Sequence, residues 1–176
     1  RYNFLTTEEK IVLICPNVRG SRGYGKKFLK ADNGEGRAKV LLDIERIYNA
    51  VAANPLWDQN RIAVMGGSYG GFMALHSMVN LNNFVRCGID VVGISNFVTF
   101  LENTSDYRRD LRRVEYGNER LPEMRKFLQE LSPLTHVEKI TRPLLIVQGA
   151  NDPRVPASES AQIEAALRKK DIETWY

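Results

Sequence analysis

Apolar and polar residues follow one another along this chain in blocks that predict strands and helices in turn. Four short apolar runs are typical of strands buried on both faces of a sheet: residues 11–15, 61–65, 87–92 and 143–147. Between and after them, the segments from about 35 to 53, 70 to 80 and 157 to 169 have the apolar spacing or pattern of helices. Residues 172–176 predict one more strand.

This alternation predicts an α/β fold with a mainly parallel sheet flanked by helices. The 176 residues amount to one domain, which is long enough to bury a core. Residues 96–131 interrupt the rhythm because they are charged and aromatic. We expect them to form two or three short helices lying over the carboxyl edge of the sheet.

The segment Gly66–Gly71 carries the strongest chemical signal, since it reads G-x-S-x-G between a predicted strand and a predicted helix. That context is a nucleophile elbow, in which a sharp turn holds the serine above the sheet edge. Ser68 is then the candidate nucleophile, and the amide of Tyr69 is a candidate oxyanion donor at the helix N-terminus. The alternative interpretation is a glycine-rich helix start with a capping serine.

A serine nucleophile needs a histidine base that is oriented by a carboxylate. Asp152 fits the acid position because it follows a buried strand, although an Asp-Pro pair also favours a simple turn. Only His76 and His136 exist, and both precede Asp152, whereas this fold places the histidine after the acid. We therefore interpret both histidines as structural and expect the chain to lack its general base.

Other classes of site find little support. The stretch Gly20–Lys27 resembles a phosphate-binding loop but has Lys27 where a hydroxyl must bind magnesium. No dinucleotide fingerprint follows the first strand, and the residues suggest neither a metal site nor a cofactor. The net charge of +4 is scattered apart from Arg108–Arg113, which we interpret as a solvated helix face rather than a nucleic-acid patch.

Nothing in the composition indicates a membrane span or a signal peptide. Cys15 and Cys87 lie in apolar runs without a C-x-x-C partner, so we expect buried free thiols. Free thiols favour a reducing compartment, and the predicted location is cytoplasmic.

Several segments together resemble the prolyl oligopeptidase family of serine peptidases, most closely its acylaminoacyl-peptidase and dipeptidyl-peptidase-like branches. The similar stretches run in order over nearly the whole chain: Asn17–Gly25 (N-x-R-G-S-x-G-Y-G), Asp58–Ala63, the elbow Gly66–Gly71, Ser132–Leu134 and Gln148–Pro156. The resemblance implies an α/β-hydrolase fold and hydrolysis of peptide bonds through an acyl-enzyme on Ser68. It also implies that Asp152 is the triad acid.

The same resemblance assigns a substrate pocket. Tyr24 would border it, and the region Phe97–Tyr116 would help to line it, with Tyr69, Phe97 and Phe100 as an apolar wall; ordinary core packing is the alternative for these side chains. Family members also carry an earlier strand with a second oxyanion donor, a later histidine, and usually a β-propeller domain. We expect residues 1–176 to be a partial catalytic domain that lacks these parts and is inactive alone.

Two other functions stay open: a carboxylester hydrolase on the same scaffold, and a catalytically dead binding module. The expected partner is a peptide substrate. In the family's sheet order, a strand missing from this chain lies beside residues 11–15. We therefore expect either that this run pairs directly with the strand at 61–65, or that a neighbouring chain or a further segment fills the gap, as a chain would in a homo-oligomer or strand-swapped dimer.

Overall fold

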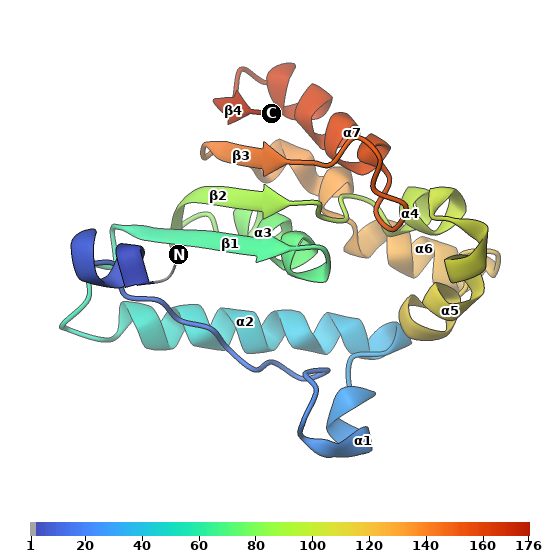
Figure 1. Cartoon of the computed structure of the whole chain (residues 1–176), viewed down its shortest axis with the longest axis horizontal. Helices are drawn as coiled ribbons and strands as arrows, with labels where there is room; N and C mark the ends of the chain where they lie inside the picture. The colour runs from blue at the N-terminus through green and yellow to red at the C-terminus, as the bar shows by residue number, and fades with distance from the viewer. Residues whose placement is uncertain (1–2) are drawn as a thin grey trace.

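The computed structural model describes residues 3–176 and contains a four-stranded sheet in which every neighbouring pair is parallel (Figure 1). The strand order in space follows the order in sequence, namely β1 (Ile62–Gly67), β2 (Val85–Val91), β3 (Leu144–Val147) and β4 (Thr174–Trp175). The strands predicted at 61–65, 87–92, 143–147 and 172–176 are therefore confirmed, each within a few residues.

Helices connect the strands, as the alternating pattern predicted. The α-helices are α1 (Gly25–Leu29), α2 (Arg37–Ala52), α3 (Tyr69–Asn80), α4 (Phe97–Asn103), α5 (Asp106–Tyr116), α6 (Pro122–Leu131) and α7 (Ala157–Arg168). Three short segments have other helical geometries: η1 (Phe4–Glu8), η2 (Gly34–Gly36) and η3 (Pro133–Lys139). None of the helices among residues 3–176 combines the length and the apolar character that crossing a bilayer requires.

The core forms on the side of the sheet that carries α3. One apolar cluster joins α3 to β2, β3 and α7 through Met78, Val85, Leu144 and Ile163. A second cluster joins the start of α3 to the helices α4, α5 and α6 through Phe72, Phe97, Tyr116 and Leu128. The helix α3 belongs to both clusters, so the residue that precedes it is anchored to the whole core.

The opposite face of the sheet carries an exposed apolar row. Met65 pairs in register with Ile89, Ile89 with Leu145, and Leu145 with Trp175, so the row crosses all four strands. Met65 is 51% exposed and Trp175 is 55% exposed. Parallel sheets normally have both faces covered, and their strands are therefore apolar on both sides. The strands of this chain have that composition, although one face of the sheet is open here.

The strand predicted at residues 11–15 is absent, so the first of the two expected arrangements, pairing with the strand at 61–65, is wrong; the second, in which another chain or segment fills the gap, stays a prediction. The segment has no regular secondary structure and lies in no sheet, and Ile11, Val12 and Ile14 are exposed. Among the described residues no strand flanks β1 on its open side, so this apolar run has no ladder to join. Cys15 is exposed for the same reason, against the expectation of a buried thiol.

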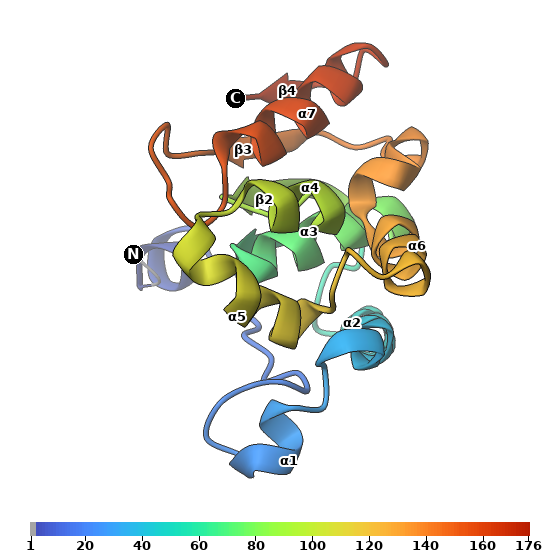
Figure 2. The ribbon, with the colours of Figure 1, turned by 90° about the vertical axis from the view of Figure 1, so that its right-hand side faces the viewer.

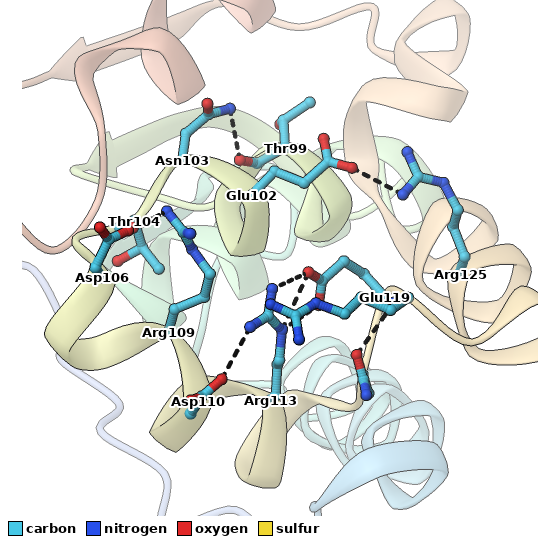
Figure 3. A network of polar contacts seen from close by, with 12 residues as sticks. Thr99, Glu102, Asn103, Thr104, Asp106, Arg109, Asp110, Arg113, Glu119 and Arg125 are labelled. Carbon is cyan, nitrogen blue, oxygen red and sulfur yellow. Dashed lines mark hydrogen bonds and ion pairs between the residues drawn. The ribbon is translucent and has the colours of Figure 1, made fainter.

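Residues 97–131 form three helices at the carboxyl ends of the strands, which confirms the predicted short helices over that edge (Figure 1). Ion pairs lie within and between them: Arg113 of α5 bonds Glu119 in the next loop at 2.5 Å and Asp110 of α5 at 2.9 Å, and Arg125 of α6 bonds Glu102 of α4 at 2.8 Å (Figure 3). Arg109 likewise bonds Asp106 at 2.8 Å. Much of the basic charge in Arg108–Arg113 is therefore neutralised by neighbouring carboxylates.

Replacing Arg113 with Met is expected to destabilise the chain by about 3 kcal/mol, because it leaves the buried Glu119 carboxylate without its cation. Burial raises the pKa of Glu119, but its bonds to Arg113 outweigh this and hold the pKa below its usual range. Urea unfolding at pH 7 measures the loss.

The matched control is Arg125→Met, which breaks the exposed pair with Glu102 and should cost less than about 1 kcal/mol. Equal losses from the two substitutions would contradict the assignment of Arg113–Glu119 as a buried pair.

Candidate active site

Ser68 lies at a sharp turn between a strand and a helix, as the G-x-S-x-G motif predicted. Strand β1 ends at Gly67 and α3 begins at Tyr69, while Ser68 itself has φ 56° and ψ −115°. Its amide donates to the carbonyl of Val91 at 2.9 Å, and its carbonyl accepts from Phe72 at 3.1 Å. These two bonds fix the turn to β2 and to the first turn of α3, and the serine is exposed at the sheet edge.

The turn is too tight for a side chain at Gly66. A Cβ atom there would stand 1.9 Å from the carbonyl oxygen of Gly70, well inside van der Waals contact. The glycine therefore permits the chain to double back so that Ser68 projects from the edge.

Tyr69 is the first residue of α3, so the helix itself offers no acceptor to its amide. Partial positive charge accumulates at this end of the helix, where an anion is stabilised. The amide lies next to Ser68 in sequence, which makes it suited to stabilise an oxygen anion that forms on a group attacked by the serine.

Asp152 lies in the loop that follows β3, at the same edge of the sheet as Ser68, because β1, β2 and β3 run parallel (Figure 1). Its Oδ1 accepts the amides of Arg154 at 2.7 Å and Val155 at 3.1 Å. Both bonds use Oδ1, so they leave Oδ2 for another donor. The residue thus forms the turn that sequence reasoning gave as the alternative, and it also presents a carboxylate oriented by backbone bonds.

The two histidines lie on another part of the molecule. His76 is within 3.2 Å of the Asn80 side chain, and the ring of His136 lies 2.8 Å from the carbonyl oxygen of Glu130. Both line a cavity of about 220 Å³ among α2, α3, α6 and η3, together with Leu41, Val79, Leu131 and Pro133. These contacts support the prediction that both histidines are structural.

The proposed pocket residues are placed differently from one another. Phe97 and Phe100 are buried beside the elbow, with Tyr69 stacked on Phe72 and the ring of Phe97 5.3 Å from that of Tyr116. They form a packed aromatic cluster. Tyr24 is 58% exposed and directly precedes α1, which projects beyond α2 on the side away from the sheet (Figures 1 and 2). The structure therefore does not bring Tyr24 to the elbow.

Sequence reasoning missed a buried carboxyl beneath the elbow. Asp90 of β2 is fully buried, pairs in register with Gly66, and packs so closely that a Cβ on Gly71 would lie 2.3 Å from its Oδ1. Burial raises the pKa of Asp90 to about 7, the charge of Glu159 adds to the rise, and the Gly93 amide opposes it. An aspartate inside an apolar strand run was the signal that could have revealed it.

A second strained residue, also missed, lies at the same edge. Val92 has φ 49°, which a β-branched residue rarely adopts, and its amide donates to the carbonyl of Val147 at 2.8 Å. Ser68 and Val92 follow the carboxyl ends of neighbouring strands. Such strain tends to gather at functional sites, and this favours the edge around Ser68 as the site. Among residues 3–176, no three His, Cys, Asp or Glu side chains are grouped so that they could hold a metal ion.

Replacing Ser68 with Gly is expected to stabilise the chain relative to Ser68→Ala by about 1 kcal/mol. Glycine removes the Cβ that makes φ 56° unfavourable, and this gain exceeds its entropic cost in the unfolded chain. The midpoints of urea unfolding for the two variants give the difference. If the alanine variant is as stable as the glycine variant, the elbow is not strained.

Acid is expected to destabilise the chain through His76. Burial, and to a lesser degree the charge of His136, lowers the pKa of His76 from 6.5 to about 4. The folded state therefore binds fewer protons than the unfolded state, so stability is full above pH 6.5 and falls as the pH decreases towards 4. Urea titrations between pH 7 and 4 should show a smaller loss in His76→Gln.

In the matched control His136→Gln, His76 stays half-buried and keeps the main cause of its lowered pKa, so most of the loss should persist. An acid loss unchanged by His76→Gln would show that other groups cause it.

The sequence profile of the prolyl oligopeptidase family matches residues 2–176. Dipeptidyl peptidase family member 6 of Caenorhabditis elegans is 38% identical over 99% of this chain and 24% of its own length. Dipeptidyl aminopeptidase BIII of Pseudoxanthomonas mexicana is 37% identical over 99% of this chain and 26% of its own length. The chain thus spans about a quarter of the length of these relatives.

Solved peptidase structures are also similar to this chain. A puromycin-hydrolyzing peptidase of Mycobacterium tuberculosis superposes on 91% of this chain and 24% of its own, with a TM-score of 0.82 and 29% identity. The acylaminoacyl peptidase of Pyrococcus horikoshii covers 90% of this chain and 26% of its own, with a TM-score of 0.79 and 26% identity. The architecture is an incomplete α/β-hydrolase fold, and the chain belongs to the prolyl oligopeptidase family.

Proposed function

We propose that this chain is part of the catalytic domain of a serine peptidase, in which Ser68 attacks the carbonyl carbon of a peptide bond. The observation that carries the proposal is the strained Ser68 at the elbow, with Asp152 in a loop at the same sheet edge. Strain at an exposed serine serves no purpose in packing, whereas it holds the hydroxyl ready for attack.

The reaction proceeds in two halves. The Ser68 Oγ gives its proton to a histidine base and bonds to the carbonyl carbon. The carbonyl oxygen becomes an anion that accepts a hydrogen bond from the Tyr69 amide. The intermediate collapses, the C–N bond breaks, and the leaving amine takes the proton from the histidine. Water then attacks the acyl-enzyme by the same route and releases Ser68.

Asp152 orients that histidine through the oxygen that its turn leaves free. Neither His76 nor His136 suits the role, because their contacts lie among α3, α6 and η3. We propose that the base, a second oxyanion donor and a propeller domain belong to the remaining three quarters of a full-length enzyme, and that residues 1–176 alone are inactive.

We propose short peptides as substrates, with Tyr69, Phe97 and Phe100 at the base of the pocket; Tyr24, which lies away from the elbow, is not part of this proposal. Support comes from relatives named as a dipeptidyl aminopeptidase and an acylaminoacyl peptidase. Those names favour a peptidase over a carboxylester hydrolase or a binding module.

The partners and location are also proposals. The ion pairs within Arg108–Arg113 support the absence of nucleic-acid binding. The two free cysteines support a cytoplasmic location. The open edge of β1 and the exposed row on the sheet support self-association, as a homo-oligomer or a strand-swapped dimer.

In the full-length enzyme, Ser68→Ala is expected to abolish turnover of peptidyl 4-nitroanilides. Asp152→Asn should lower kcat by about 10⁴-fold, because the histidine loses the carboxylate that holds its tautomer. Initial rates across a panel of peptidyl 4-nitroanilides measure both effects, with circular dichroism to show that each variant folds.

The controls are His76→Gln and His136→Gln, which should retain kcat within about threefold, since ordinary surface or packing changes act weakly on chemistry. If either histidine proves as important as Ser68, the base has been misassigned. Hydrolysis of 4-nitrophenyl esters without any peptidyl anilide would replace the peptidase with an ester hydrolase.

A further inference from the structure

Arg37 is a fully buried cation that touches the residue after the candidate nucleophile. It lies at the first position of α2 and its side chain is 0% exposed. The guanidinium carbon stands 4.6 Å from the ring centroid of Tyr69 and 4.2 Å from that of Tyr116. Both distances lie within the range of cation–π attraction, which strengthens when the cation is withdrawn from water.

The polar partners of Arg37 are few for a buried charge. One nitrogen lies 3.5 Å from the carboxylate of Asp32, another donates to the carbonyl of Glu115 at 3.2 Å, and Nε has no partner among the described residues. Burying a cation with one long ion pair costs free energy that an apolar residue would not. The contacts with the two aromatic rings are therefore the main favourable interactions of the buried guanidinium.

Asp32 links Arg37 to the loop that carries N-x-R-G-S. Gly20 in that loop has φ 91°, and a Cβ there would lie 2.4 Å from the carboxyl carbon of Asp32. The loop thus packs against Asp32, Asp32 pairs with Arg37, and Arg37 packs on Tyr69. A continuous set of contacts runs from the motif in the first quarter of the chain to the elbow.

The ring of Tyr69 also contacts two other aromatic rings. It is stacked on Phe72 at 5.7 Å and lies edge-on to Tyr116 at 6.1 Å, while its buried hydroxyl has no hydrogen-bond partner among residues 3–176. A strained backbone such as that of Ser68 persists only where its surroundings over-determine it. Tyr69 directly follows Ser68, so its contacts are part of those surroundings.

We propose that Arg37 is a positioning residue, which clamps the ring of Tyr69 and thereby orients the Tyr69 amide towards the oxyanion. The inference rests on the proposed function, because it assigns Arg37 to the oxyanion-stabilising side of that reaction. Arg37 touches neither the substrate nor the reacting atoms. Its effect should therefore appear in kcat, where the oxyanion forms, and leave substrate binding unchanged.

The test uses the full-length enzyme with a peptidyl 4-nitroanilide whose turnover is lost in Ser68→Ala. Arg37→Met should lower kcat by about 10- to 100-fold with KM within about twofold, because a small displacement of an oxyanion donor has effects of this size. Arg37→Lys keeps the cation but not its planar face, so its kcat should lie between those of the unsubstituted enzyme and Arg37→Met. Tyr69→Leu should lower kcat as much as Arg37→Met and should also raise KM, because Tyr69 is proposed to line the pocket. The kcat of the double variant should be no lower than that of Tyr69→Leu.

The matched control is Arg113→Met, which removes another largely buried arginine but touches neither Tyr69 nor the elbow. It should lower the thermal midpoint and leave kcat unchanged. If Arg37→Met does not fold, Arg37→Lys serves as the test instead. A kcat at least about threefold lower than that of the unsubstituted enzyme, at unchanged KM, supports the proposal.

Three results would overturn the inference: an unchanged kcat in the folded Arg37 variants, a loss that appears only in KM, or an equal loss of kcat in Arg113→Met. Failure of the proposed function gives a different pattern, in which Ser68→Ala retains peptidyl anilide turnover. The two failures are therefore distinguishable in one set of assays.

Discussion

The parallel pairing of β1 with β2, and of β2 with β3, decides where the candidate groups lie. Because parallel strands end at the same edge, Ser68 after β1 and Asp152 after β3 come to one side of the sheet although the chain between them is long. The helices α4 and α5 also follow β2 at that edge. An antiparallel step anywhere among these strands would separate the serine from the carboxylate.

Within that frame, the elbow stores strain that its neighbours maintain. Ser68 and Val92 both adopt positive φ, and each is tied by its amide to the strand beside it. Below them lies the buried Asp90, and beside them the aromatic cluster around Arg37. A backbone that is unfavourable by itself is therefore fixed by packing from three sides, which is how a scaffold keeps a reactive group in place.

One face of the sheet leaves apolar side chains exposed to solvent. Met65, Leu145, Val147 and Trp175 alternate with core residues along strands whose composition suits burial on both sides. The run Ile11–Ile14 is exposed in the same way, without a ladder. Parallel sheets normally have both faces covered, and this chain spans about a quarter of the length of its relatives.

The sequence by itself determined the features that depend on local pattern. Apolar runs predicted four of the strands, the three-and-four spacing of apolar residues predicted the long helices, and the glycines around Ser68 predicted the elbow. Each of these features depends on residues that are close together in the chain. The failure at residues 11–15 has a tertiary cause: an apolar run becomes a strand only when a neighbour completes its hydrogen bonds. The position of Asp152 after a buried strand likewise predicted its place at the edge of Ser68. Only the tertiary structure placed Tyr24 away from the elbow and buried Arg37 and Asp90. Those placements depend on contacts between distant segments, and residue type at a single position carries no record of them.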